Sequence, residues 1–147
     1  MEIIRASVEN KNAVYALLCE LENKKIDRAQ FETSFLRNMT NKDIFYLLAV
    51  ENDVVVGFAS IHVQLLLHHA GPVGEIQEII VNKKYRGQNV GKMLYHSLKE
   101  IAEENSCVLL EVCCNQSRIE SHPFYLSQGM QNTHYKFTLP LTESISQ

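Results

Sequence analysis

The feature that most constrains the fold is residues 44–67, "IFYLLAVENDVVVGFASIHVQLLL". β-Branched and aromatic residues dominate both sides of a short polar tip, "END", and this pattern is typical of two strands joined by a tight turn. The sequence therefore predicts an antiparallel hairpin here. A hairpin of this length indicates a fold built around a sheet.

Three other stretches show the apolar spacing of helices that bury one face. The first stretch follows Ser7, a residue type suited to capping a helix. The second stretch comes directly after the first. The third comes after the polar loop at residues 82–88. The positions expected to face inward are Val14, Leu17, Leu18 and Leu21 in the first, Phe31, Phe35 and Leu36 in the second, and Val90, Met93, Leu94, Leu98 and Ile101 in the third.

Further strands are expected at residues 2–7, 74–81, 107–114 and 133–141, with a short helix within 118–128. The resulting order is strand, two helices, hairpin, strand, helix, strand, helix, strand. This order predicts an α/β fold, in the form of an α+β three-layer arrangement with a mixed central sheet flanked by helices. A chain of 147 residues supports one core, so we expect a single domain over 1–147.

Charge and hydropathy exclude several classes of protein. The net charge of -3 argues against nucleic-acid binding, which needs a basic face. Glu2, Arg5 and Glu9 interrupt the region where a signal peptide would be apolar, and no apolar run approaches the roughly 20 residues that cross a bilayer. We expect a cytoplasmic protein with no membrane partner.

The cysteines are Cys19, Cys107, Cys113 and Cys114, and they lack the paired spacing of a zinc site. We expect reduced thiols that act as small apolar residues. Nothing near Cys113 and Cys114 in the sequence supplies a base that would stabilise a thiolate, so a nucleophilic cysteine is not favoured.

The junction "VNKKYRGQNVGKML", residues 81–94, joins a strand to a helix through a glycine-containing turn. Such a turn leaves unpaired N–H groups at a helix start, which attract anions. Gly87 and Gly91 let a ligand approach the backbone, and Asn89 tolerates a left-handed conformation. Positive charge around this anion site comes from Lys83, Lys84, Arg86 and Lys92.

The junction fits neither common nucleotide-binding glycine motif. At Arg86, Gly87, Asn89 and Gly91 it resembles the pyrophosphate loop of the GCN5-related N-acetyltransferases (GNAT), although Asn89 stands where most members have glycine. The aminoalkylphosphonate N-acetyltransferase branch of that family shares this asparagine. It also resembles the chain at "AVYALLCEL", "LHH", "GEIQE" and in residues 124–137.

The resemblance implies the GNAT fold, acetyl-CoA as cosubstrate and a homodimer as one option. The residues that it places at acetyl-CoA are Ile79, Ile80, Val81, Arg86, Gly87, Gln88, Asn89, Val90, Gly91, Lys92, Asn115 and Tyr125. It also implies that a main-chain N–H of Ile79 or Ile80 holds the oxyanion and that Tyr125 protonates the leaving thiolate.

Acetyl transfer needs a neutral amine, and neutralising an alkylammonium of pKa about 10.4 at pH 7 costs roughly 4 to 5 kcal/mol. A base is therefore useful, and the resemblance points to Glu78 or Glu75 on the strand before the loop. Strict alternation puts Glu78 on the face of Ile76 and Ile80, and Glu75 on the opposite face. We expect Glu78 to be the base, acting through water.

On the acceptor side, the resemblance places Arg118 and His69, where a guanidinium suits an oxyanion. It also raises a divalent metal there as an option, but no spacing among His62, His68, His69, His122 and His134 specifies a metal site. Two alternatives stay open. One is transfer to another amine, such as a polyamine, an amino acid or a protein N-terminus, decided by residues 26–43. The other is a non-catalytic module that senses acetyl-CoA.

Overall fold

The computed structural model describes residues 1–143. The chain forms two compact units, Met1–Val112 and Cys113–Gln147. The prediction of a single domain over 1–147 stays a prediction. Each unit is described by itself below.

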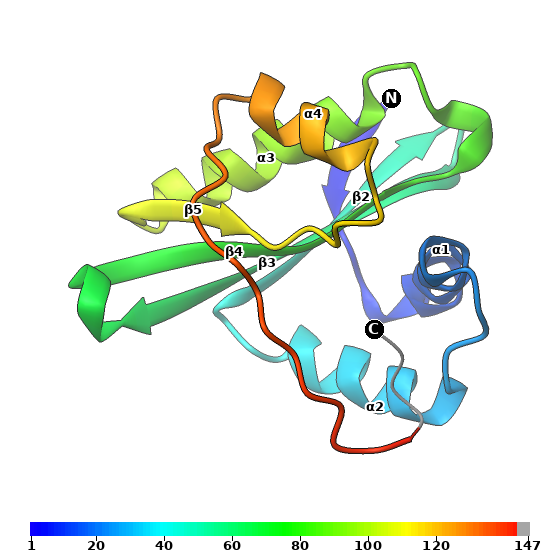
Figure 1. The fold of residues 1–147 in the computed structure, drawn as a ribbon. Coiled ribbons are helices and arrows are strands. Elements are labelled where there is room, and N and C mark those ends of the chain that lie inside the picture. The colour runs from blue at the N-terminus through cyan, green and yellow to red at the C-terminus, as the bar shows by residue number, and fades with distance from the viewer. Residues whose placement is uncertain (144–147) are drawn as a thin grey trace. The chain divides into compact units, whose positions relative to one another are not determined.

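The first unit is built on a five-stranded mixed sheet in the order β1-β2-β3-β4-β5 (Figure 1). β1, β2, β3 and β4 pair antiparallel, and β5 pairs parallel to β4. The strands are β1 (Glu2–Arg5), β2 (Ile44–Glu51), β3 (Val54–Leu66), β4 (Gly71–Val81) and β5 (Leu109–Val112). The mixed sheet and the hairpin of β2 and β3 were predicted from the sequence and are confirmed.

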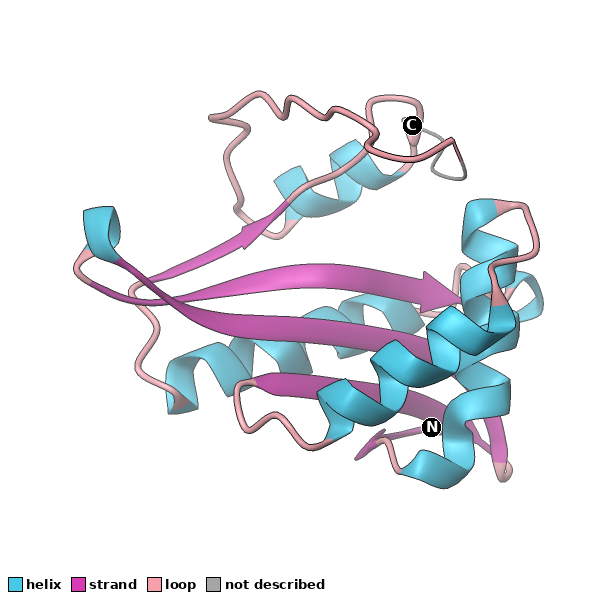
Figure 2. Ribbon diagram, turned by 90° about the horizontal axis from the view of Figure 1, so that it is seen from below, coloured by secondary structure: helices cyan, strands magenta, loops and turns pink. Residues whose placement is uncertain are grey.

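Helices cover both faces of this sheet (Figures 1 and 2). The helices are α1 (Lys11–Glu22), α2 (Arg28–Met39) and α3 (Val90–Glu104), with short 3-10 turns at Val8–Asn10, Leu67–His69 and Lys83–Tyr85. α1 and α2 pack on one face, where Val14, Leu17 and Phe35 meet Leu48, Phe58 and Ile80. α3 lies on the other face and buries Val90, Leu94, Tyr95, Leu98, Ile101 and Ala102.

Two details of the predicted helices differ from the structure. Leu36 is 43% exposed, although it was expected on the inner face of α2. Phe31 and Phe35, four residues apart, already fill that face, and Leu36 lies one residue, or about 100°, further round the helix. Ser7 precedes a 3-10 turn, and its hydroxyl contacts Asn10 Oδ1 instead of capping α1 directly.

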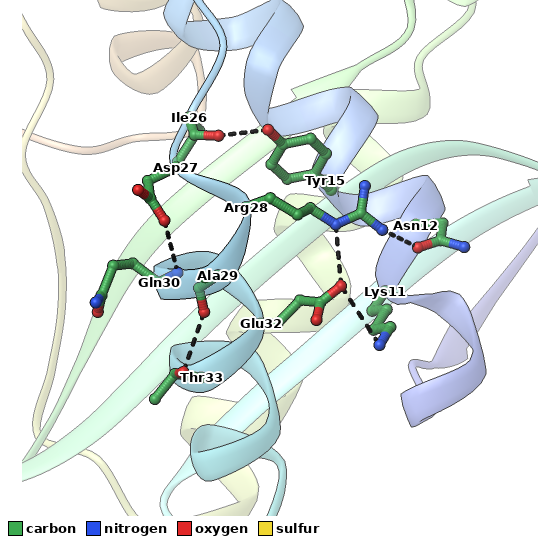
Figure 3. Close-up of polar contacts among 10 residues, drawn as sticks. All are labelled: Lys11, Asn12, Tyr15, Ile26, Asp27, Arg28, Ala29, Gln30, Glu32 and Thr33. Carbon is green, nitrogen blue, oxygen red and sulfur yellow. Dashed lines mark hydrogen bonds and ion pairs between the residues drawn. The ribbon is translucent and has the colours of Figure 1, made fainter.

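A polar cluster holds α1 against the start of α2 (Figure 3). The Arg28 guanidinium lies 4.5 Å from the centre of the Tyr15 ring, donates to Asn12, and is 3.0 Å from Glu32 Oε1. The Tyr15 hydroxyl donates to the carbonyl of Ile26. Asp27 caps α2 by accepting from the Gln30 N–H at 2.9 Å. These contacts fix where α2 begins relative to α1.

The turn between β2 and β3 consists of two residues in the left-handed region, Asn52 (φ 49°) and Asp53 (φ 64°). Two positive φ angles define a type I′ turn, in which glycine is strongly preferred at the second position. We expect Asp53→Gly to raise the free energy of unfolding by about 0.5 to 1 kcal/mol. Urea denaturation measures this change in the free energy of unfolding. Asp53→Ala is the matched control and should lower stability, so equal effects of the two variants would contradict this account.

In the second unit, α4 (Ser121–Ser127) confirms the predicted short helix. The predicted strand at 133–141 is wrong: within the described residues, this segment forms no strand. The alternating side chains of Tyr135, Phe137 and Leu139 are 80–93% exposed. Alternation indicates which side chains share a face, but a strand also needs a neighbour to pair with its backbone, and the sequence does not show that neighbour.

No helix within residues 1–143 is both long enough and apolar enough to span a bilayer.

Candidate active site

A β-bulge in β4 decides which way the two candidate glutamates point. Glu78 is paired with Ser60, and Ile76 is paired with Ile61, so Gln77 is an extra residue opposite β3. Glu75 is paired with His62. Because Ser60 and His62 lie two residues apart on β3, Glu78 and Glu75 share the sheet face of α1 and α2. The prediction of opposite faces was wrong, because a bulge shifts the alternation by one residue.

Glu78 lies in a row of polar side chains that crosses three strands. Tyr46 is paired with Ser60, and Ser60 with Glu78. The Ser60 hydroxyl donates to Glu78 Oε1 at 2.6 Å. Burial raises the pKa of the Glu78 carboxyl, the Ser60 hydrogen bond opposes that rise, and the charge of Glu22 on α1 adds to it. A carboxyl with a raised pKa is suited to accepting a proton near neutral pH.

His62 and Glu75 continue this face of the sheet. Burial lowers the pKa of His62, and the charge of Glu75 partly offsets that effect. The Glu75 carboxylate accepts a hydrogen bond from the Gln77 side chain. His62 therefore belongs to the strand pair that follows Ser60 and Glu78 on this face of the sheet. No spacing in the sequence distinguishes it from the other histidines.

His69, expected near the acceptor, lies elsewhere in the first unit. It ends the 3-10 turn at the tip of the β3–β4 hairpin, beside His68. Glu78 lies seven positions along β4 from Gly71, which at about 3.3 Å per residue corresponds to about 23 Å. Within the first unit the structure does not bring His69 and Glu78 together.

The end of β4 presents main-chain N–H groups on the edge that faces away from β3. β5 pairs with β4 only from Val73 to Ile76. The N–H groups of Glu78 and Asn82 both point toward β3, where they donate to Ser60 Oγ and to the Val56 carbonyl. Alternation then directs the N–H groups of Ile79 and Val81 to the opposite edge. Of the two predicted oxyanion donors, this geometry favours Ile79 over Ile80.

The loop after β4 leads into α3, and the N-cap side chain does not hydrogen-bond to the first N–H groups of this helix. Asn89 adopts the left-handed conformation (φ 64°), as the sequence predicted, and its side chain makes no capping hydrogen bond. The first N–H groups of α3 therefore keep their capacity to bind an anion. The loop and the first turn of α3 contain the predicted residues Gln88, Val90, Gly91 and Lys92.

Arg86 fastens the loop to the rest of the first unit. Its Nε donates to the Val81 carbonyl at 3.2 Å, and its Nη2 lies 3.8 Å from Glu20 Oε1 on α1. The same Glu20 oxygen accepts the Lys83 N–H at 3.3 Å. The guanidinium thus positions the strand end and the loop, in addition to contributing the positive charge expected from the sequence.

Gly87 has a φ of 80°, and a Cβ built at this position would meet no atom within 4 Å. Any effect of substitution should therefore come from the backbone and not from a clash. We expect Gly87→Ala to lower the free energy of unfolding by about 1 to 2 kcal/mol, measured by urea denaturation. Gly87→Asn should lose less, because asparagine tolerates this conformation, and equal losses would show that the backbone is not the cause.

A shallow hollow of about 400 Å³ lies between β1 and the start of α3. Ile3, Asn89, Lys92, Met93, His96 and Ser97 line it. Two of these residues, Asn89 and Lys92, belong to the predicted cofactor set. The hollow therefore adjoins the open helix start.

The second unit contains Asn115, Arg118 and Tyr125. Asn115 Oδ1 accepts hydrogen bonds from the N–H and the hydroxyl of Ser117 at 2.8 and 2.7 Å, so this residue shapes a turn. Its carbonyl accepts the Arg118 N–H at 3.0 Å. Tyr125 is half-buried in α4, with its ring 5.2 Å from that of Phe124.

All four cysteines are free thiols, as predicted. Burial raises the pKa of Cys114, and a hydrogen bond from Ser121 and the charge of Arg118 oppose that rise. A raised pKa disfavours the thiolate that an acyl-thiol intermediate would need. Among residues 1–143, no group of three or more His, Cys, Asp or Glu side chains is arranged to hold a metal ion.

Comparison with known proteins identifies the family of this chain. The sequence model of the Acetyltransferase (GNAT) family matches residues 11–130. The chain therefore belongs to the GNAT acetyltransferase family and is an N-acetyltransferase. Members of this family use acetyl-CoA and an amine acceptor.

The chain is similar to individual N-acetyltransferases with named substrates and to solved structures. The chain is 39% identical to aminoalkylphosphonate N-acetyltransferase of Salmonella typhimurium (strain LT2) over 140 residues, covering 95% of this chain and 91% of that protein. It is 25% identical to glucosamine 6-phosphate N-acetyltransferase 1 of Dictyostelium discoideum, over 84% of this chain and 82% of that one. A solved structure of a transcriptional regulator from Bacillus halodurans C-125 has a TM-score of 0.88 at 17% identity, covering 95% and 99% of the two chains, which shows a shared fold alone.

Proposed function

We propose that the chain transfers the acetyl group of acetyl-CoA to the primary amine of an aminoalkylphosphonate. The similarity that carries this proposal is the 39% identity to the Salmonella aminoalkylphosphonate N-acetyltransferase, which extends over 95% of the chain. The site described above contains a carboxyl of raised pKa, edge amides on β4 and an open helix start. These are the parts that acetyl transfer from a phosphate-bearing thioester requires.

In this proposal, Glu78 removes a proton from the acceptor ammonium, directly or through one water. The neutral nitrogen then attacks the carbonyl carbon of the thioester, and the carbonyl oxygen becomes an oxyanion. The Ile79 N–H suits that oxygen, since a fixed backbone donor needs no reorganisation as charge develops. Val81 pairs its backbone with the extended arm of acetyl-CoA, and the first turn of α3 holds the pyrophosphate.

Collapse of the intermediate forms the amide and breaks the carbon–sulfur bond, so that a thiolate leaves. We assign its protonation to the Tyr125 hydroxyl, whose position in "HPFYLSQG" matches the general-acid tyrosine of the family. A phenol is more acidic than water and can donate to a thiolate that departs in a dry site. Asn115 is assigned to acetyl-CoA on the same grounds.

The substrate class follows from what the named relatives act on. Aminoalkylphosphonates and glucosamine 6-phosphate each carry a primary amine and a phosphorus oxyanion. Arg118 is the residue proposed for the oxyanion, because a guanidinium can bind two oxygens at once. Glu78 and Glu75 on the sheet, together with Glu22 on α1, create negative charge that attracts the ammonium end.

The same negative charge supports one rival acceptor. A polyamine has ammonium groups and no anionic group, so it would also be attracted to Glu22, Glu75 and Glu78. An amino acid or a protein N-terminus carries less positive charge and gains less from this face. Turnover of a phosphonate should therefore depend on Arg118, whereas turnover of a polyamine should not.

The test is release of free CoA thiol from acetyl-CoA across a matched set of amines, each with and without divalent metal. The set contains aminomethyl- and aminoethylphosphonate, their carboxylate analogues, glucosamine 6-phosphate, spermidine and a short peptide. Turnover selective for the phosphonates, and lost in Arg118→Ala, is expected. Selective turnover of spermidine would contradict the proposed acceptor, and binding of acetyl-CoA without turnover of any amine would leave the sensor alternative. The metal arms test the ion implied by the phosphonate branch.

A further inference from the structure

Ser60 makes an unusual pair of contacts with the proposed base. Within residues 1–143 it is the one polar side chain that is fully buried, at 0% exposure. Its hydroxyl donates to Glu78 Oε1 at 2.6 Å, and its oxygen accepts the main-chain N–H of Glu78 at 3.2 Å. One hydroxyl therefore contacts both the carboxylate and the main-chain N–H of Glu78.

This arrangement depends on the bulge at Gln77. In a regular antiparallel pair, the Glu78 N–H would donate to a main-chain carbonyl of β3. At the bulge this N–H donates to Ser60 Oγ at 3.2 Å. The hydroxyl hydrogen of Ser60 points to the carboxylate. Glu78 Oε1 is thereby engaged, and Oε2 is the oxygen left to accept a proton from the acceptor or from water.

We propose that Ser60 is a positioning residue for acetyl transfer, which holds the Glu78 carboxylate in one orientation with Oε2 toward the acceptor amine. This inference rests on the assignment of Glu78 as the base. In this proposal Ser60 contacts neither acetyl-CoA nor the acceptor amine and acts through Glu78. A hydrogen bond to the charged carboxylate also keeps more of Glu78 ionised than burial alone would allow.

The other groups around Glu78 affect its carboxyl in different ways. Glu22 on α1 carries negative charge that favours the protonated carboxyl. Tyr46 on β2 lies beyond Ser60 in the same row, and its oxygen accepts from Asn38 Nδ2 of α2 at 2.8 Å. His62 on β3 and Glu75 on β4 form the next pair on this face of the sheet. Ser60, in contrast, stabilises the carboxylate by donating a hydrogen bond to it.

A purely structural role for Ser60 makes different predictions, so the test compares two variants of β3. Ser60→Ala removes the hydroxyl and little volume. Val56→Ala, at a second position of 0% exposure on the same strand, creates a small cavity and no polar change. The carboxyl carbon of Glu78 is titrated by ¹³C NMR, with its signal assigned by its absence in Glu78→Gln. kcat/KM is measured against pH for each protein.

In Ser60→Ala we expect the Glu78 pKa to rise by about one unit, with the acid limb of kcat/KM moving by the same amount. kcat/KM at pH 7 should fall by about tenfold or more, because the carboxylate is also less well oriented. Ser60→Thr keeps the hydroxyl and should keep the wild-type titration. Val56→Ala should lower thermal stability and move neither curve.

An unchanged Glu78 titration in Ser60→Ala would overturn the proposal, as would a shifted titration with unchanged kinetics. Failure of the base assignment gives a separate signal, because Glu78→Gln would then retain activity. The NMR titration does not depend on turnover. The two hypotheses can therefore fail independently.

Discussion

Replacing Glu78 with glutamine is expected to lower kcat/KM by about 10²- to 10⁴-fold, the range that a general base contributes. Glutamine keeps the volume and can still accept the Ser60 hydrogen bond, so the sheet should be undisturbed. It cannot accept a proton from the acceptor. Affinity for acetyl-CoA, measured by calorimetry, should stay the same, because the loop and helix start are unchanged.

The pH dependence of activity gives a second measurement. Burial raises the pKa of Glu78, so the carboxylate is lost as the pH falls through that raised value. The acid limb of kcat/KM should therefore lie above the pKa of an exposed glutamate, and it should be missing in Glu78→Gln. Glu75→Gln is the matched comparison on the same face. Should Glu75→Gln lose more activity than Glu78→Gln, the base would be Glu75.

Stability should change in the opposite direction to activity. Because the pKa of Glu78 is higher in the fold than in the unfolded chain, the native state binds its proton more tightly. Stability from this group is present below the unfolded pKa and is lost as the pH rises through the folded pKa. Above that folded pKa the wild type has lost it, and glutamine, which stays neutral, avoids that loss. Glu78→Gln should therefore be as stable as the wild type or more stable.

Local patterns predicted the sheet well and its irregularities poorly. The β2–β3 hairpin is visible because its alternation and its polar turn depend on neighbouring residues. The bulge at Gln77 is not visible, since it depends on how two strands align and not on either strand alone. That one residue decides whether Glu75 and Glu78 share a face. It also decides whether Ser60 meets the carboxylate, so strand patterns cannot identify Ser60.

The candidate site was predictable where it depends on backbone conformation. Asn89 in the left-handed conformation and Gly87 at a positive φ follow from residue types that tolerate those angles. Side chains that reach across the fold were harder to predict. Glu20 of α1 meets Arg86 and Lys83, and Glu22 influences Glu78, although about 60 residues separate each pair. No local spacing in the sequence records such contacts.

Gly91 gives the sharpest test of the cofactor site. We expect Gly91→Phe to weaken acetyl-CoA binding by about 100-fold or more, because a large side chain in the first turn of α3 would block the open N–H groups. Gly91→Ala should still bind, since a single methyl group adds little bulk at the start of α3. Calorimetry measures both. Neither variant should lose helix stability, because glycine is itself unfavourable inside a helix.

A control separates blockage of the site from a general effect of an added phenylalanine. Glu100→Phe places the same side chain at an exposed position in the last turns of α3 and should leave the affinity unchanged. If Gly91→Phe bound acetyl-CoA as tightly as Glu100→Phe, the pyrophosphate could not lie at the first turn of α3. The proposed role of Val81 and Ile79 would then need revision as well, because the same extended cofactor must pass the β4 edge before it reaches the helix.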